Sequence, residues 1–366
     1  MHSVIDTGRR ISERLEFGLL SDPTRTFEAK LNQFSQGQKM KIDAVIAWVD
    51  GASPAHRLKR APFIENDTTS LKEAKSDVRF EGDDEILFCL RSICNHAPWI
   101  NRIWVITDNQ KPPINGSLGS LKKISVVDHK AIYRGYEHLL PTFNSLSIET
   151  MMWRIPGLAD HFIYFNDDMG LCGKVSPSDF VDQGKTIARG KWTSYPADQA
   201  GLWQANQVVS AEMIGFTRSR LFSDAHVPKI MSRHVFEELF KLHEAAFIKN
   251  ASYRFRSPEQ FLPAGLHEHY AHKTGGAVQK VERDWVHFTI RNCRKDPIEV
   301  VHPKLEELVS GNRKLYCVND YQTLKARFAS TEFYLGRASG PPQIFEKEAS
   351  FAQRWRSVFP RKNPNS

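Results

Sequence analysis

The stretch HFIYFNDDM (His161–Met169) joins a short apolar run to a cluster of carboxylates, and the fold class follows from this combination. The run His161–Phe165 has strand length and is rich in aromatic residues, which predicts a buried β-strand. It stops at Asn166, Asp167 and Asp168, whose side chains favour turns. The stretch therefore predicts a strand that presents polar side chains at its carboxyl end.

Three other apolar runs stop at an acidic residue in the same way. They are Ile42–Val49, Arg102–Thr107 and Lys123–Val127, which stop at Asp50, Asp108 and Asp128. Helical patterns lie between strands, from Glu85 to about Asn95 and from about Ser147 to Ile155. Alternating buried strands and helices predict an α/β fold with a mostly parallel sheet and helices on both faces. Ligands bind beyond the carboxyl ends of such strands, so we expect the acidic ends to meet at one crevice. Each aspartate alone is also explained as a turn residue.

The distribution of apolar, polar and charged residues along the chain predicts four segments. Residues 1–40 are a polar N-terminal extension, 41–200 the α/β core, 201–335 a helical subdomain that returns to the active site, and 336–366 a basic C-terminal tail. The helical subdomain is expected to act as a lid on the sheet, because amphipathic stretches such as Val235–Phe247 dominate it.

Charge and composition limit the classes of molecule that the protein is expected to bind. The chain has 366 residues and a net charge of +8, which suits phosphates or an anionic surface. No nucleic-acid motif, Walker A loop, GxGxxG or GxSxG motif is present, so we expect no nucleic-acid partner. Five cysteines without CxxC spacing indicate a reducing, cytoplasmic location. A basic amphipathic pattern from Phe351 to Lys362 leaves peripheral contact with the inner membrane open; a helix packed on the main domain is the alternative.

A histidine cluster at His267–His272 invites comparison with zinc proteases. The zincin motif needs histidines four residues apart on one helix face, but Ala271 stands four residues after His267. The zinc-protease interpretation is therefore rejected, and exposed or hydrogen-bonded histidines are expected instead.

The region before the carboxylate cluster adds a second set of candidates. Asn144 and Ser145 begin a helix whose free N–H groups and positive dipole end suit a phosphate. Glu149 lies in the first turn, where helix capping is the alternative role. Asp167 and Asp168 have the oxygens that Mg²⁺ prefers, and either one is also a candidate acceptor for a proton from an attacking hydroxyl.

Five blocks of sequence resemble the signature blocks of the Stealth family of sugar-1-phosphate transferases, which includes bacterial capsule polymerases. They are Ala47–Gly51, Asp83–Pro112, Leu140–Met169, Ala225–Leu239 and Cys317–Asp320. The resemblance implies a glycosyltransferase-A-like fold whose core at 41–200 binds a UDP-sugar, with Mg²⁺ or Mn²⁺ as cofactor. It implies transfer of hexose-1-phosphate, or N-acetylhexosamine-1-phosphate, to a saccharide hydroxyl in capsular or exopolysaccharide synthesis, with release of UMP.

The resemblance also assigns site residues. Catalytic roles fall on Glu149, Asp168, His226, Arg256 and Asp320. It places Asp50 and Asp108 in the donor site. The residues themselves make Gly51, Asn144, Ser145, Asn166, Asp167 and Asn319 further candidates for substrate binding. The metal ligands would be Asp168 and Asp320. His226 is a candidate general base, since its ordinary pKa lies near working pH, and Arg256 a candidate for diphosphate oxygens.

Two rival functions remain open from the sequence. An ordinary glycosyltransferase would share fold and donor but release UDP after attack at the sugar carbon. A non-enzymatic module would bind a polyanion through its basic surface, although acidic strand ends would repel such a partner unless a cation intervened.

Overall fold

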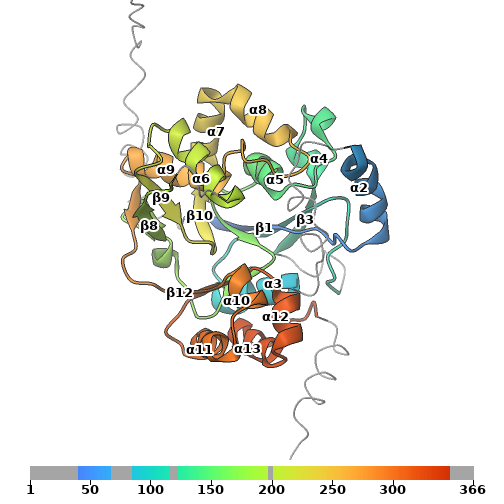
Figure 1. Ribbon diagram of the computed structural model, residues 1–366, viewed down its shortest axis with the longest axis vertical. Coiled ribbons are helices and arrows are strands. Elements are labelled where there is room, and N and C mark those ends of the chain that lie inside the picture. The colour runs from blue at the N-terminus through green and yellow to red at the C-terminus, as the bar shows by residue number, and fades with distance from the viewer. Residues whose placement is uncertain (1–39, 67–84, 116–122, 197–200, 347–366) are drawn as a thin grey trace, which may run out of the picture. The chain divides into compact units, whose positions relative to one another are not determined.

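The computed structural model describes residues 40–66, 85–115, 123–196 and 201–346. The described residues from Lys41 onward belong to one compact unit (Figure 1). The predicted N-terminal extension, up to residue 39, and the basic amphipathic pattern after residue 350 lie outside the described residues.

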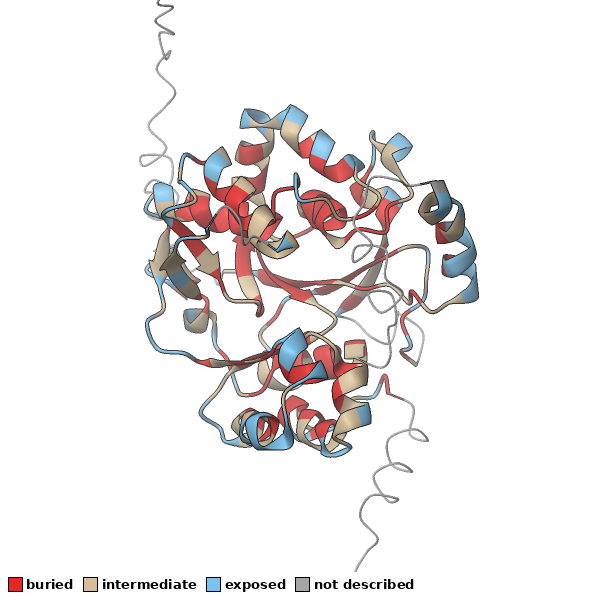
Figure 2. Cartoon of the chain, viewed as in Figure 1, coloured by how far each residue is buried: buried red, intermediate tan, exposed pale blue. Residues whose placement is uncertain are grey.

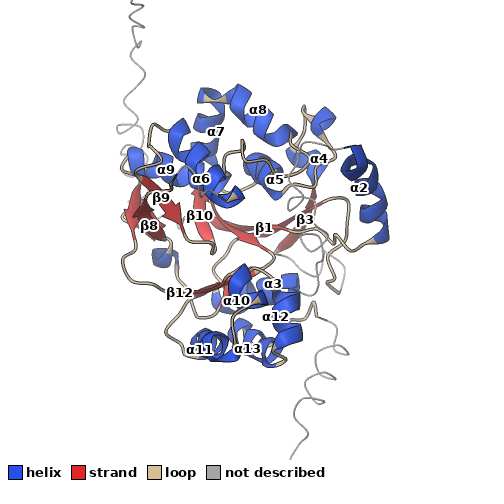
Figure 3. Ribbon diagram, viewed as in Figure 1, coloured by secondary structure: helices blue, strands red, loops and turns tan. Residues whose placement is uncertain are grey.

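A five-stranded sheet forms the centre of this unit, in the order β10-β4-β1-β2-β3. Its strands are β1 (Ile42–Ala47), β2 (Ile103–Thr107), β3 (Ile124–Asp128), β4 (His161–Asn166) and β10 (Lys229–Ser232). Strands β1 to β4 pair in parallel, and β10 alone runs antiparallel, beside β4. All four strands predicted from the sequence are confirmed, as is the mostly parallel α/β class (Figure 3).

Helices cover the upper face of this sheet in the view of Figure 1. They are α4 (His129–Ile132), α5 (Ser145–Met151), α6 (Leu202–Met213), α7 (Arg233–Leu242), α8 (Glu244–Ser252) and α9 (Pro263–Lys273). Side chains from β1 to β4 and from α5, α7, α8 and α9 form one buried core on this side. The part of the helical region predicted after residue 200 that runs from α6 to α9 packs on this sheet, and the same region supplies strand β10.

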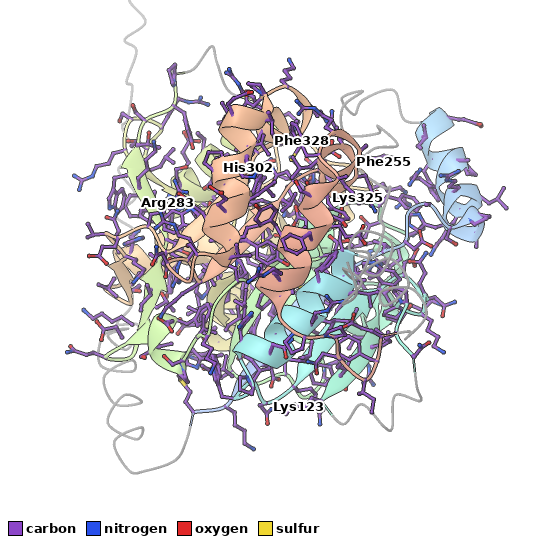
Figure 4. The ribbon with its side chains drawn as sticks, turned by 90° about the horizontal axis from the view of Figure 1, so that it is seen from below. Lys123, Phe255, Arg283, His302, Lys325 and Phe328 are labelled. Atoms are coloured by element: carbon purple, nitrogen blue, oxygen red, sulfur yellow. The ribbon has the colours of Figure 1, made fainter. Side chains whose placement is uncertain are left out.

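A second, smaller sheet lies below the first and carries its own core. It has the order β12-β13-β5, formed by β5 (Met169–Leu171), β12 (Trp285–Phe288) and β13 (Leu315–Val318). The helices on this side are α3 (Glu85–His96), α10 (Ile290–Arg294), α11 (Ile298–Val309), α12 (Tyr321–Arg327) and α13 (Ser330–Ser339). Figure 4 looks onto this layer from below, with His302 of α11 and Lys325 of α12 in view. Figure 2 shows that the buried residues concentrate where the helices meet the two sheets.

Short strands and one helix complete the edges. A three-stranded sheet has the order β11-β7-β6, and β8 pairs with β9. These strands are β6 (Val181–Asp182), β7 (Lys185–Ala188), β8 (Gly190–Thr193), β9 (Leu221–Asp224) and β11 (Ala277–Gln279). Helix α2 (Pro54–Asn66) follows β1 at the opposite edge (Figure 1).

Two boundaries can be compared with the sequence pattern. The amphipathic stretch Val235–Phe247 is divided at His243, whose backbone leaves helical geometry and separates α7 from α8. The break lets both helices pack Phe236 and Phe247 into one core. Helix α13 continues through Ser339 and so crosses the expected start of the C-terminal tail at residue 336.

The five cysteines are free thiols. Among the described residues, no helix combines the length and the apolar character that a membrane span requires.

A buried carboxylate, Asp43 of β1, ties together the segments on both sides of its strand. It is fully buried and accepts hydrogen bonds from Asn101 Nδ2 (2.8 Å), Trp104 Nε1 (2.8 Å) and the backbone N–H of Ala159 (2.9 Å). Asn101 lies just before β2, Trp104 lies in β2, and Ala159 lies just before β4. The single carboxylate therefore helps to set the stagger of three neighbouring strands.

We expect Asp43→Ala to lower the free energy of unfolding by about 1–3 kcal/mol, because the buried Trp104 Nε1 would be left without a partner. Urea unfolding measures the effect. The exposed Asp182→Ala is the matched control and should stay within about 0.5 kcal/mol. A loss below about 1 kcal/mol for Asp43→Ala would show that the strands hold their stagger without this carboxylate.

Candidate active site

The carboxyl ends of β1 and β4 lie side by side, since Ala47 is paired with Asn166 in the parallel register. Directly after β4, the chain turns at Asp167 and Asp168 and enters β5 of the second sheet. The carboxylate pair therefore sits at the junction of the two sheets. This is the position that the sequence predicted for a ligand site.

Asp168 is the centre of the cluster found there. Its Oδ2 lies 3.5 Å from the Cys317 thiol, which donates a hydrogen bond, and 4.0 Å from Nε2 of His226. Its Oδ1 is buried and has no hydrogen-bond partner among the described residues. Burial raises the pKa of Asp168 to about 7, with a further contribution from the charge of Asp167. Burial likewise raises the pKa of Asp167 to about 6.

His226 reaches Asp168 from the turn between β9 and β10. Its ring is about one-third exposed, and its centroid lies 5.8 Å from that of His287 in β12. Burial lowers the pKa of His226 well below its ordinary value, and the neighbouring His287, Lys229 and Arg256 lower it further. The imidazole is therefore neutral at working pH and has a lone pair free for a proton or a cation.

Glu149 and Arg256 form a second part of the site. Glu149, on α5, is 4% exposed and hydrogen-bonds with the hydroxyls of Ser145 and Tyr164. Burial raises the pKa of Glu149 to about 7, and the positive charge of Arg256 opposes that rise. Arg256 Nη2 donates to Ser145 Oγ at 2.5 Å. The Tyr164 hydroxyl also donates to Asn166, which links this part to the end of β4.

Asn319 and Asp320, the two residues that follow β13, have different surroundings. Asn319 Oδ1 lies 3.2 Å from the Cys317 thiol and 3.0 Å from Nε2 of His287, so Asn319 borders the cluster. Asp320 caps α12, accepting from the Thr323 N–H at 3.2 Å. Its other oxygen accepts from Nε of Arg294 at 2.6 Å. These two contacts of Asp320 are structural, and its predicted catalytic and metal-binding roles stay predictions.

One group among the described residues has the composition and spacing to hold a metal ion. It consists of Asp168, His226 and Cys317, whose ligand atoms all lie within 4.8 Å of one another. The sequence named Asp168 and Asp320 as metal ligands. The structure keeps Asp168 in the group and adds an imidazole nitrogen and a thiol.

The predicted donor-site residues after β1 and β2 make local contacts. Asp50 Oδ1 accepts from the N–H groups of Ala52 (3.0 Å) and Ser53 (3.1 Å), which shapes the turn at the buried Gly51. Asp108 Oδ1 accepts from Lys59 Nζ at 2.6 Å. Both aspartates therefore follow the ends of their strands as predicted, and both carboxylates accept hydrogen bonds from other groups of the protein.

Asn144 has an internal role as well. It is 1% exposed, its Oδ1 accepts from the Leu146 N–H at 3.1 Å, and its Nδ2 donates to Gln260 Oε1 at 2.8 Å. Asn144 is thereby the N-cap of α5 and also anchors the segment before α9. Its predicted substrate contact stays a prediction.

Several residues of the site were not predicted from the sequence. They are Cys317, Tyr164 and His287. Cys317 and Tyr164 lie on strands within three residues of a predicted site residue, so strand alternation was the available signal for these two. His287, on β12, has no predicted site residue near it in the sequence. Their mutual proximity depends on the pairing of β5 with β13, which no local pattern in the sequence specifies.

Two histidines of the cluster on α9 are hydrogen-bonded to the backbone, which is one of the two alternatives expected from the sequence. His267 Nε2 accepts from the Ser232 N–H at 2.9 Å, and His269 Nε2 accepts from the Phe222 N–H at 3.0 Å. Burial lowers the pKa of both histidines, and that of His267 falls to about 3. These neutral rings satisfy backbone donors at the start of α7 and in β9.

Fold and site together describe an α/β protein with acidic, imidazole and guanidinium groups gathered beyond the carboxyl edge of its sheet. Residues 40–68 match the family model described as Stealth protein CR1, conserved region 1. Residues 79–189 match Stealth protein CR2, conserved region 2. The chain therefore has two regions that are similar to conserved regions 1 and 2 of the Stealth family.

Relatives carry names of polysaccharide phosphotransferases. Exopolysaccharide phosphotransferase SCO6023 of Streptomyces coelicolor is 30% identical over 314 residues, which cover 81% of this chain and 50% of that protein. Exopolysaccharide phosphotransferase cps2G of Lactiplantibacillus plantarum is 28% identical over 319 residues, covering 78% of this chain and 89% of that protein. Capsular polysaccharide phosphotransferase cps1A of Actinobacillus pleuropneumoniae is 35% identical over 152 residues, covering 41% of each chain. This chain spans about half the length of SCO6023.

Among solved structures, galactosyltransferase LgtC in complex with donor and acceptor sugar analogues is similar, at 14% identity and a TM-score of 0.43. The alignment covers 87% of this chain and all of that one. The α/β class described above rests on the strand order itself.

A buried acid next to the site, Glu268 of α9, couples stability to pH. It is 6% exposed, its Oε1 has no hydrogen-bond partner among the described residues, and burial raises its pKa from 4.5 to about 8. The folded protein therefore keeps a proton that the unfolded chain releases between these two pH values. The free energy of unfolding must fall as pH rises through this window.

We expect Glu268→Gln, which removes the ionisation, to become more stable relative to the natural protein as pH rises from 5 to 8. The relative gain should be about 1 kcal/mol or more, since a tenfold change in proton affinity corresponds to about 1.4 kcal/mol. Thermal unfolding across this pH range measures it, with the exposed Glu299→Gln as control. A difference between Glu268→Gln and the natural protein that stays constant with pH would contradict the assignment.

Proposed function

We propose that this protein transfers a hexose-1-phosphate from a UDP-sugar to a saccharide hydroxyl, forming a phosphodiester and releasing UMP. The observation that carries the proposal is the placement of the neutral His226 imidazole 4.0 Å from Asp168, with the Arg256 charge acting on both groups. The names of the relatives point to polysaccharide phosphotransfer as the class of reaction. Synthesis of a capsular or extracellular polysaccharide is the corresponding process.

The proposed step is a displacement at phosphorus. The acceptor hydroxyl oxygen forms a bond to the β-phosphorus of the donor, and the bond from that phosphorus to the bridging oxygen breaks. UMP leaves with the bridging oxygen, and the bond between the sugar carbon and its own oxygen stays intact. The hydroxyl proton passes to a base of the protein. Positioning and neutralisation of charge dominate such transfers.

The residues of the cluster suit these tasks. His226 takes the proton, because its neutral ring has a free lone pair beside the carboxylate that would stabilise the imidazolium. Arg256 binds diphosphate oxygens through its planar guanidinium. Glu149 and Ser145 hold that guanidinium in place through the hydrogen bond at 2.5 Å and the opposite charge.

A divalent cation such as Mg²⁺ or Mn²⁺ is part of the proposal. The buried Asp168 Oδ1, which has no partner among the described residues, fits an oxygen-binding cation, and Asp167 supplies a second carboxylate. When bound, the cation would neutralise negative charge on the diphosphate. Asp320 would join only after exchanging its bond with Arg294.

The nucleotide that leaves decides between this function and its rivals. The protein is incubated with Mg²⁺, a panel of UDP-hexoses and a mixed oligosaccharide acceptor, and the released nucleotide is identified by chromatography. We expect UMP from the natural protein and none from Asp168→Asn. Release of UDP instead would establish ordinary glycosyl transfer. Absence of either nucleotide, with acceptor-independent polyanion binding, would favour a non-enzymatic module.

We expect His226→Ala to lower the rate of UMP release by about 10²–10⁴-fold, the range for loss of a general base. The exposed His138→Ala is the matched control and should retain the natural rate. Steady-state kinetics at saturating donor measure both variants. A loss below about tenfold for His226→Ala would remove the imidazole from proton transfer.

A further inference from the structure

The centre of the site has donor atoms of three different kinds. Asp168 offers a carboxylate oxygen, His226 an imidazole nitrogen and Cys317 a sulfur, and these atoms lie within 4.8 Å of one another. Mg²⁺ takes oxygen ligands almost exclusively, whereas Zn²⁺ and its neighbours favour nitrogen and sulfur. The donor set therefore goes beyond what a magnesium site needs.

Backbone contacts hold two of these donors in place. Cys317 is paired with Met169 across the antiparallel β13–β5 ladder, and the Val318 N–H donates to the Asp168 carbonyl at 2.9 Å. The Cys317 thiol already points at Asp168 Oδ2, at 3.5 Å. Little reorganisation is needed for both side chains to bind one ion.

The third donor approaches from the other sheet. His226 lies between β9 and β10, and the neighbouring Ala225 N–H donates to the Arg189 carbonyl at 2.7 Å. Its Nε2 is 4.0 Å from Asp168 Oδ2. A cation between these atoms would draw donors from three chain segments that are distant in sequence, with a fourth position left open.

We propose that Asp168, His226 and Cys317 form a binding site for a thiophilic divalent cation, represented by Zn²⁺, within the candidate active site. Binding forms one bond each from the cation to oxygen, nitrogen and sulfur. The sulfur–hydrogen bond of Cys317 breaks, and its proton is released to solvent. The negative charge of Asp167 favours the ion, and the positive charges of Arg256 and Lys229 oppose it.

Such an ion would act as an inhibitor. It would occupy the lone pair of His226 and the carboxylate of Asp168, both of which proton transfer and Mg²⁺ binding require. The inhibition rests on the proposed function, whereas the binding itself does not. A spectroscopic test of binding therefore separates the two.

Cobalt substitutes for zinc and reports directly on a bond to sulfur. The full chain, reduced and free of metal, is titrated with Co²⁺ while its absorption spectrum is recorded. We expect a sulfur-to-cobalt charge-transfer band that saturates at one equivalent, is abolished by Zn²⁺ and persists in excess Mg²⁺. Absence of the band, or its loss on addition of Mg²⁺, would overturn the proposal.

Two variants assign the band to this site. Cys317→Ser should lose it, and Cys94→Ser, which removes a cysteine of α3 outside the cluster, should keep it. His226→Ala keeps the sulfur, and its Co²⁺ affinity should fall by at least about tenfold, as loss of a supporting group already costs 10–100-fold. Circular dichroism confirms that each variant is folded. A band unchanged in folded Cys317→Ser, or an affinity unchanged in folded His226→Ala, would contradict the site.

Discussion

The hydrogen bond from the Val318 N–H to the Asp168 carbonyl, at 2.9 Å, begins the pairing on which the whole site depends. Asp168 ends the turn after β4 of the central sheet, and Val318 ends β13 of the second sheet. Their pairing, continued by Cys317 opposite Met169, joins the two sheets at the carboxyl edge. Without it, the thiol and Asn319 would have no reason to lie near the carboxylates.

Low polarity around this junction explains the charge state of the cluster. Burial raises the pKa of Glu149 and of Asp168 to about 7 and lowers that of His226 well below its ordinary value. Each shift favours the neutral form, because a charge in a poorly solvated site is costly. An arriving cation or phosphate changes that balance and stabilises the ionised carboxylates or the imidazolium. In the proposed function, ligand binding and ionisation would therefore promote each other.

The sequence predicted the strands well and the site in part. Strong apolar runs ending in aspartate, such as Ile42–Val49, specify a buried parallel strand through local chemistry alone, and all four were found. The placement of Asp168 beside His226 needed the family resemblance, since His226 alone has no distinguishing pattern. Cys317 could not be found locally, because its role depends on a pairing between segments almost 150 residues apart, as the 149-residue separation from Asp168 shows. Asp320 shows the opposite case, a residue that the family resemblance places in the site. Its two carboxylate oxygens accept hydrogen bonds from the first turn of α12 and from Arg294.

The central claim is that the bond between phosphorus and the bridging oxygen breaks, and that the sugar keeps its own oxygen. An isotope measurement tests it most directly. The donor is prepared with ¹⁸O at the oxygen that links the sugar carbon to the β-phosphorus, and product and nucleotide are analysed by mass spectrometry after one turnover. Transfer of sugar-1-phosphate predicts that all of the label appears in the saccharide product and none in the nucleotide. Label that leaves with the nucleotide would show that the sugar carbon was attacked, and would contradict the proposed mechanism.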